Sequence, residues 1–428
     1  MGRLAWLAGL LSLAVTGLAA QDRAAMLTLA EAEQLALRNH PRAAAARLLA
    51  EAALETPRQT RALLAPVISG HLTGSVAENG TRLGAGQLNP SSLFSRTATG
   101  FSINQVLWDF GRVRALSASF DARAAGAADS AGAIRAEIRL RVRDAYFRRL
   151  MAEAQLEALR QNLETRRLTQ RQIAALVSSN LRSTLDLSFA DLAAAEAELA
   201  LNRAESDVRA GDVDLSAALG LPAAAHFLLR DEPDPEAAPD SPEALVASAI
   251  DSRPDVRALR QQVRAARSFA ESEQRLSRPT LSAAGVAGMF GPSDANLRQR
   301  YGAVGVNLSI PLFNGGQFAS RRTEAQKRAE AAQEDLRDLE LRVGRDVRLV
   351  LVEVQNARQR LELTAKVLDQ ANRTLRLAQT RYDLGLGTIL ELATAQLSRT
   401  TAEVSARSAR YEVLIRQAQL DFQLGRIR

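Results

Sequence analysis

The chain has 428 residues, no cysteine and a formal net charge of +7, and the missing cysteines exclude disulfide bonds, thiolate metal sites and lipid attachment to an N-terminal cysteine. Only 4% of the residues are aromatic, and the abundance of alanine, leucine, arginine and glutamate is typical of long packed helices. The arginines alternate with acids along the predicted helical faces, and this pattern of ion pairing argues against nucleic acid as a partner.

The first twenty residues have the pattern of a secretory signal peptide. Arg3 precedes an apolar run over 4–15, and small residues follow up to Ala19 and Ala20. We expect cleavage after Ala19 or after Ala20. The alternative is a membrane anchor, which needs about 20 apolar residues with charge on both flanks. No later stretch is long and apolar enough to be a transmembrane helix, so the mature chain is predicted to be exported and to cross no membrane as a helix.

Two helical segments separated by Pro41 are predicted over residues 29–53, and two strands follow over 67–76 and 99–108. Each strand alternates apolar residues with small or polar ones over about ten positions, as transmembrane β-strands do. Trp108 stands at the end of the second strand, where an aromatic girdle would lie. These strands therefore predict part of a membrane β-barrel.

A long helix, a turn and a returning helix complete the first half of the chain. Apolar residues recur at heptad spacing over 138–177, although Arg149, Arg166 and Gln170 intrude. We expect the turn near residues 179–184. The first half therefore ends in a helical hairpin.

The second half repeats this plan, with Asn180 equivalent to Gly385. Six uninterrupted heptads end at Tyr382 and predict one helix from about Gln317 to Tyr382. At 1.5 Å per residue this helix is roughly 100 Å long. The equivalent segments are 29–53 and 242–266, the strands 67–76 and 280–289, the strands 99–108 and 301–310, and the turns 179–187 and 385–392.

We therefore expect a signal peptide at 1–20, a first structural repeat at 21–221, a Pro-rich acidic linker at 222–245 and a second repeat at 246–428. Each repeat supplies two strands, and the resulting four strands cannot close into a barrel. An open strand edge in lipid would leave backbone groups unpaired at several kcal/mol each. Several chains must therefore share one barrel.

The duplicated order of helix, two strands, long helix and returning helix resembles the TolC family of bacterial outer-membrane efflux proteins over essentially the whole mature chain. PLFNGG at 311–316 is similar to the family's PLFDGG pattern, and RYDLGLGTILELATAQ at 381–396 is similar to RYxxGxxxxxDLxxAQ. The first copy of PLFDGG departs from the pattern, because Val106 replaces the proline and Phe110 replaces the first glycine.

The resemblance implies a mostly α-helical homotrimer with a membrane β-barrel part. Four strands from each of three chains would form a 12-stranded outer-membrane barrel, and long coiled-coil helices would form a trimeric α-barrel tunnel in the periplasm. The family takes substrate from an inner-membrane pump through a periplasmic adaptor (membrane fusion) protein, in efflux or in type I secretion. Outer-membrane lipid would surround the barrel, and no catalytic residue, metal or cofactor is implied. The residues do not choose among drugs, metal ions and polypeptides as cargo.

The resemblance also assigns roles at the two helical turns, which would lie together at the periplasmic tip. It implies closing contacts for Asp186 and Tyr382 and an acid ring for Glu391, while Arg182 is a candidate substitute for the arginine that Gly387 replaces. Structural alternatives remain open for these residues. Asp186 and Glu391 suit the first turn of any helix, and Tyr382 occupies a heptad position.

The turn residues are expected to reverse the chain and to dock the adaptor. Gly385 and Gly387 permit the positive φ values that a reversal can require. A phosphate-binding loop is a poor alternative, because Leu390 stands at the position of its third glycine and no strand precedes it. Asn180 and Ser183 are expected to take the same parts in the first half. The predicted turn and docking residues are Asn180, Leu181, Ser183, Gly385, Leu386, Gly387 and Thr388.

An enzyme and a structural coiled-coil protein of the periplasm are the other functions to consider. His40, His71 and His226 are the only histidines and fall in a helix break, a strand and a linker. No HExxH, GxSxG or Walker motif is present. The sequence therefore predicts a non-enzymatic outer-membrane channel, with the periplasmic coiled coil as the alternative.

Overall fold

The computed structural model describes residues 26–76, 82–83, 91–92, 96–233, 241–291 and 299–427. The predicted signal peptide and residues 234–240 of the predicted linker lie outside this part of the chain. The helices are α1 (Leu29–Asn39), α2 (Pro41–Ala53), α3 (Glu55–Ala62), α4 (Arg112–Ser178), α5 (Thr184–Ala218), α6 (Pro242–Ser252), α7 (Pro254–Gln274), the 3-10 turn Arg275–Ser277, α8 (Gln317–Asp383) and α9 (Ile389–Gln423). The strands are β1 (Met26–Leu27), β2 (Val67–Ser75), β3 (Arg82–Leu83), β4 (Ser91–Ser92), β5 (Arg96–Trp108), β6 (Leu228–Leu229), β7 (Thr280–Phe290) and β8 (Arg300–Ser309).

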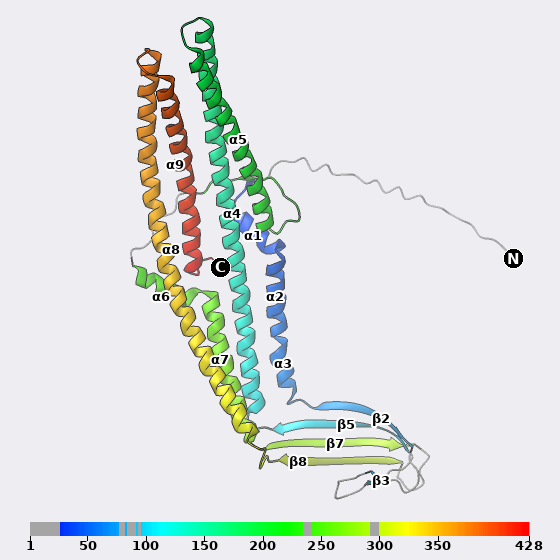
Figure 1. The fold of residues 1–428 in the computed structure, drawn as a ribbon. Coiled ribbons are helices and arrows are strands. Elements are labelled where there is room, and N and C mark those ends of the chain that lie inside the picture. The colour runs from blue at the N-terminus through cyan, green and yellow to red at the C-terminus, as the bar shows by residue number, and fades with distance from the viewer. Residues whose placement is uncertain are drawn as a thin grey trace, which may run out of the picture.

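Two helices run through the whole length of the helical part (Figure 1). α4 and α8 each contain 67 residues, which corresponds to roughly 100 Å. α5 and α9, with 35 residues each, return beside them from one end. The shorter helices α2, α3 and α7 lie beside the other halves of α4 and α8 (Figure 1). The single long helix that the heptads predicted from Gln317 is thus confirmed. None of the helices in the described ranges has both the length and the apolar character that a membrane crossing requires.

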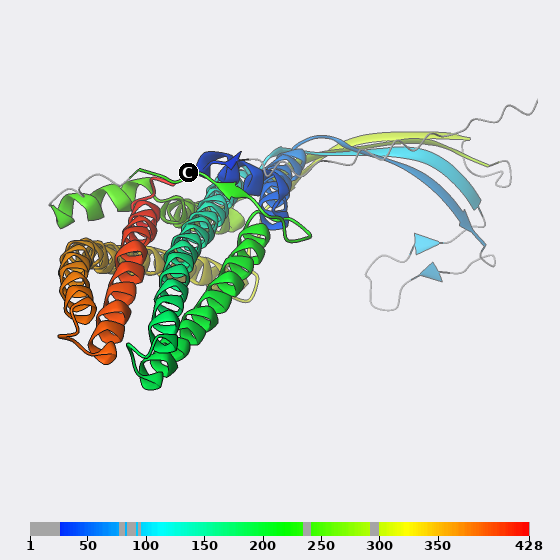
Figure 2. The ribbon, with the colours of Figure 1, turned by 90° about the horizontal axis from the view of Figure 1, so that it is seen from above.

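The four predicted strands form one antiparallel sheet in the order β2-β5-β7-β8, which extends sideways from the end of the helical part opposite the turns (Figures 1 and 2). The register gives the sheet two different faces. Ile68, Ile103 and Val304 lie on one face, whereas Ser69, Ser102 and Asn104 lie on the other. The predicted alternation of apolar with small or polar residues therefore corresponds to the two faces of a single sheet.

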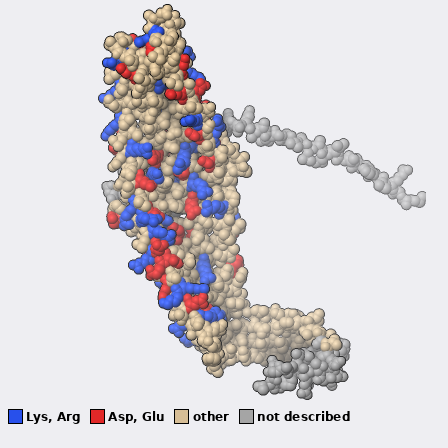
Figure 3. Space-filling view, in the orientation of Figure 1, with Lys and Arg blue, Asp and Glu red and all other residues tan. Residues whose placement is uncertain are grey.

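The apolar face of the sheet is open to its surroundings in a single chain. Leu72 is 86% exposed and Val304 is 89% exposed. No charged side chain appears on the part of the sheet that Figure 3 shows in colour, whereas basic and acidic residues are interspersed over the helices. An uncovered apolar face of this size needs a covering surface, and lipid is one such surface.

The core has separate parts along the helices. The heptad residues Val343, Val347 and Val354 of α8 are buried against α6, α7 and α9. A second part lies at the middle of α4, where Tyr146 packs with Leu215 of α5 and with residues of α1 and α9. The apolar spacing of the sequence is therefore the spacing of contacts between helices.

The arginines that interrupt the first-half heptads are buried with polar partners. Arg149 is 1% exposed, and its Nε donates to Asp212 Oδ1 at 2.6 Å while Nη1 donates to Glu153 Oε2 at 3.0 Å. Arg166 donates from Nη1 to Gln396 Oε1 at 2.5 Å. Because a buried charge is costly without partners, these residues belong to fixed polar contacts that replace apolar packing.

The start of the described chain is joined to the linker. β1 and β6 pair in parallel. The Tyr146 hydroxyl donates a hydrogen bond to the Arg230 main-chain oxygen at 2.6 Å and lies 2.8 Å from the Leu27 main-chain oxygen. Arg410 of α9 holds the next part of the linker, since its Nη1 donates to Asp231 Oδ2 at 2.6 Å. These contacts connect both helical hairpins through one belt of short segments at mid-height.

Candidate functional site

The two helical turns lie at the same end of the molecule (Figure 1). Asn180 and Gly385 both have left-handed backbones, with φ of 54° and 73°. In each turn the backbone amide of the next residue donates a hydrogen bond to a carbonyl oxygen in the last turn of the preceding helix. Leu181 N donates to Leu176 O at 2.9 Å, and Leu386 N donates to Arg381 O at 2.8 Å. The prediction that Asn180 does in the first half what Gly385 does in the second is confirmed.

Gly387 differs from the sequence prediction. It is absent from the residues with positive φ, so the reversal does not depend on its left-handed freedom. Its amide donates to Arg381 O at 3.0 Å, and a Cβ added there would lie 3.2 Å from Arg381 Cβ and 3.2 Å from the Tyr382 nitrogen. Glycine therefore suits position 387 because the chain passes close to the end of α8, where a side chain would be tightly packed.

Each returning helix begins at a side-chain cap, as predicted. Ser183 Oγ accepts from Leu185 N at 3.1 Å, and Thr388 Oγ1 accepts from Glu391 N at 3.2 Å. Such caps satisfy amides that have no partner within the helix. They fix where α5 and α9 start relative to the turns.

Arg182 of the first turn contacts Tyr382 of the second. Its Nη2 donates to the Tyr382 main-chain oxygen at 2.7 Å, and its guanidinium lies 4.3 Å from the centre of the Tyr382 ring. The ring is therefore held by a cation–π contact as well as by packing. This contact joins the α4–α5 hairpin to the α8–α9 hairpin at their tips.

Tyr382 is 5% exposed and belongs to a small apolar cluster. Its hydroxyl oxygen is buried and accepts or donates no hydrogen bond within the described residues. Burial raises the pKa of Tyr382, the Arg182 charge opposes this, and the charges of Asp186 and Asp383 add to the rise. The cluster also contains Ile173, Ala190, Ile389 and Leu392. The predicted packing role of Tyr382 is thus confirmed, and its role in closing a tunnel stays a prediction.

Asp186 and Glu391 both lie in the first turn of a helix, where the dipole favours acids. The Asp186 carboxylate makes no hydrogen bond or ion pair within the described part of the chain, so the structure does not join it directly to Tyr382. Glu391 Oε2 lies 3.6 Å from Arg381 Nε, and both side chains are half exposed. The charge of Glu391 is therefore partly balanced within its own hairpin, and the roles of both acids in a gate stay predictions.

The tips also present leucines to the surroundings. Leu181 is 69% exposed and Leu386 is 68% exposed, one in each turn. Leu185, Leu384 and Leu390 beside them are exposed as well. Grouped apolar side chains of this kind mark surfaces that bind other proteins.

Below the tips, α4 and α9 meet through polar side chains, which the sequence reading did not identify. Thr400 Oγ1 donates to Asn162 Oδ1 at 2.7 Å, and Gln155 Nε2 donates to Ser408 Oγ at 2.7 Å. The pair of Arg166 and Gln396 lies one helical turn nearer the tips than the pair of Asn162 and Thr400. Arg166 at a heptad position was the signal available in the sequence, and its pairing with Gln396 across α4 and α9 explains it.

The chain matches the family model described as outer membrane efflux protein over residues 32–221 and 245–426. It is 32% identical over 117 residues to the outer membrane efflux protein BepC of Brucella suis, which is 27% of this chain and 26% of BepC. It is 25% identical over 372 residues to the outer membrane protein OprJ of Pseudomonas aeruginosa, which is 83% of this chain and 75% of OprJ. The crystal structure of the outer membrane protein VceC from Vibrio cholerae has a TM-score of 0.77 and 21% identity, covering 93% of this chain and 96% of VceC.

Proposed function

The chain belongs to the outer membrane efflux protein family, and from this premise we propose that it is the outer-membrane channel of a tripartite efflux or type I secretion system. It conducts substrate from an inner-membrane pump and a periplasmic adaptor to the outside of the cell. One observation supports the proposal above all others. Within one continuous chain, helices of roughly 100 Å emerge from a sheet that has an exposed apolar face. Such a chain reaches from the outer membrane deep into the periplasm.

Three chains are proposed to close one barrel. In a single chain, β2 and β8 form the two edges of the four-stranded sheet. If the apolar face meets lipid, these edges need partners, because unpaired backbone groups are costly in hydrocarbon. Pairing β8 of one chain with β2 of the next gives a closed barrel of twelve strands from three sheets of four strands each.

The long helices of the three chains form the tunnel wall. α4, α5, α8 and α9 of one chain lie side by side as a curved layer (Figure 2), and three such layers enclose a passage in line with the barrel. The shorter helices α3 and α7 complete the wall near the membrane. The channel family has no need of catalytic chemistry, because the passage itself performs the function.

The tips are proposed to close the resting tunnel and to receive the adaptor. The support for closure is that Arg182 and Tyr382 join the two hairpins where the tunnel would narrow. The support for adaptor docking is the pair of exposed leucines, Leu181 and Leu386, one at each turn. The described linker residues 222–233 are proposed to form part of the belt that keeps the two hairpins together.

Membrane fractionation followed by conductance in planar bilayers tests the proposal. We expect the protein in the outer-membrane fraction, as a trimer whose migration on a gel changes on heating, and as discrete ion-conducting channels after reconstitution. Recovery in the soluble periplasmic fraction without channel activity would instead support the structural coiled coil. The exposed apolar face of the sheet argues against that alternative, since a soluble protein rarely leaves such a face uncovered.

A further inference from the structure

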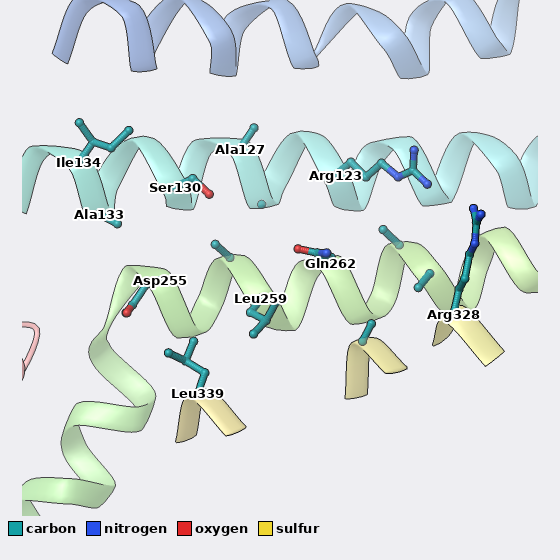
Figure 4. Close-up of a pocket in the computed structure, with 15 residues that line it drawn as sticks. Arg123, Ala127, Ser130, Ala133, Ile134, Asp255, Leu259, Gln262, Arg328 and Leu339 are labelled. Carbon is teal, nitrogen blue, oxygen red and sulfur yellow. The ribbon is translucent and has the colours of Figure 1, made fainter. Parts of the chain in front are cut away.

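A groove follows α7 between α4 and α8, in the half of the helical part nearer the sheet (Figure 4). Its volume is about 720 Å³, which is within the range of about 300–1,000 Å³ for small-molecule sites. Ala127 of α4 and Ala258 and Ala266 of α7 leave this space because their side chains are short, and Gly126 lets α4 approach α7, since a Cβ there would lie 3.3 Å from the Ala258 oxygen. The groove is thus formed by side chains of three neighbouring helices.

The middle of the groove is lined mostly by apolar side chains, with the uncharged polar groups of Ser130 and Gln262 among them, and the charged side chains stand at its ends. Ile134, Leu259 and Leu339 contribute the larger apolar surfaces. Arg123 and Arg328 lie at the end nearer the sheet, and Asp255 lies at the other (Figure 4). Between Arg123 and Ile134 the α4 helix rises by roughly 16 Å, at 1.5 Å per residue. The groove therefore fits an elongated apolar body.

The charges at the two ends are not equally compensated. Asp255 forms a bidentate pair with Arg253, with distances of 2.7 and 3.0 Å, and Arg328 pairs with Glu324 at 2.6 Å. Arg123 has no ion pair and no hydrogen bond within the described residues. Its guanidinium lies instead 5.1 Å from the centre of the Phe120 ring and 6.0 Å from that of Phe269. One uncompensated positive charge is therefore held at the end of the groove by two aromatic rings.

The groove lies away from the chain's lateral edges. α7 packs against α4 on one side and against α8 on the other. If three chains assemble side by side as proposed, a neighbouring copy meets the outer helices of this layer and not α7, so the groove is expected to stay open in the assembly.

We propose that this groove binds an amphiphile with an elongated apolar body and a single anionic group, which Arg123 receives. The apolar body lies along α7, where burial of apolar surface supplies most of the affinity, and the guanidinium fixes the orientation through charge-assisted hydrogen bonds. The inference goes beyond the proposed conduit, because such binding is measurable whether or not the protein conducts.

The test uses the purified full chain and a dansyl-labelled undecanoic acid, with its uncharged methyl ester as a second probe. We expect saturable fluorescence enhancement with the acid and weaker enhancement with the ester. Arg123→Gln should weaken binding of the acid about tenfold, the effect of losing one charged hydrogen bond, and should leave the ester unchanged. Ala266→Phe, which fills the groove, should abolish binding of both probes.

Arg160→Gln is the matched control, because Arg160 is an exposed arginine further along α4 and outside the groove. It removes the same charge and should leave both affinities unchanged. The proposal is overturned if the wild-type protein shows no saturable binding, or if Arg160→Gln weakens binding as much as Arg123→Gln. Conductance of the same preparations separates this result from the proposed function, since a conducting protein that binds neither probe contradicts the groove alone.

Discussion

The Arg182 guanidinium lies 4.3 Å from the centre of the Tyr382 ring and donates a hydrogen bond to the Tyr382 main-chain oxygen at 2.7 Å. This pair connects the turn of one hairpin to the end of the long helix of the other. If the tips surround the narrow end of the tunnel, as we propose, separation of this pair is the local change expected on opening. The proposal therefore predicts that a single substitution in the pair loosens the closed tip.

Arg182→Gln should raise the single-channel conductance of the resting protein. It removes the cation–π contact, worth about 0.5–2 kcal/mol, together with the charged hydrogen bond. Arg171→Gln is the control, because Arg171 is exposed near the same end of α4 and has no hydrogen bond or ion pair within the described residues. Equal conductance of the Arg182 variant and the wild type in planar bilayers would show that this pair does not hold the tunnel closed.

Tyr382 should act through its ring and not through its hydroxyl. The hydroxyl is buried without a hydrogen-bond partner, so Tyr382→Phe should leave the thermal unfolding temperature and the conductance close to wild type, or slightly stabilise the tip. Tyr382→Ala should cost about 3–5 kcal/mol of local packing and raise the conductance. A large conductance increase in Tyr382→Phe would contradict this and would indicate a partner for the hydroxyl in the assembled tip.

The glycines of the second turn should respond differently to substitution. Gly385→Asn should be nearly neutral, because Asn180 already adopts the same left-handed backbone in the first turn. Gly385→Ala should cost about 1 kcal/mol or more, since alanine is strained at positive φ. Gly387→Ala should also destabilise, because its Cβ would come within 3.2 Å of backbone and side-chain atoms of α8. Thermal unfolding of the three variants measures the differences, and equal stability of Gly385→Asn and Gly385→Ala would contradict the φ argument.

Much of the fold follows from periodicity, since alternation over ten residues and heptads over forty are set by the geometry of strands and helices. The turns were predictable for a related reason, because asparagine and glycine are the residues that tolerate a left-handed backbone. The role of Gly387 was not predictable, because sequence does not reveal how closely the chain passes the end of α8.

The contact of Arg182 with Tyr382 could not be predicted from the sequence either. The two residues come from hairpins far apart in sequence, and only the packing of α4 against α9 brings their turns together. The same holds for the polar pairs between those helices, such as Asn162 with Thr400. Position in a heptad indicates burial, but the partner of a buried polar group depends on which helices become neighbours.

Tyr146 should make stability depend on alkaline pH. Burial, followed by the charges of Glu232 and Asp231, raises its pKa from 10.0 to about 12, against the effect of its hydrogen bond to Arg230. Because the pKa of the folded state is raised, the contribution of Tyr146 is complete below about pH 10 and is lost as pH rises from there through about 12. In Tyr146→Phe the unfolding temperature should fall at neutral pH, since the hydrogen bond from the hydroxyl to the Arg230 oxygen is lost. Its further decline between these pH values should be smaller than in the wild type. An identical alkaline decline in both proteins would contradict the assignment.

Two adjacent arginines of α4 should differ sharply in their contribution to stability. The Arg149 side chain is buried and donates to Asp212 and Glu153. Arg149→Ala therefore leaves Asp212, whose side chain is only 14% exposed, without its arginine partner and should cost about 3–5 kcal/mol. Arg148 also pairs with an aspartate, Asp144 at 2.7 Å, but its side chain is 60% exposed, so Arg148→Ala should cost less than about 1 kcal/mol. Comparison of the two unfolding temperatures measures the contrast. Similar unfolding temperatures for both variants would mean that the Arg149 ion pair stabilises the protein no more than a surface ion pair does. Apolar packing alone would then hold α4 against α5.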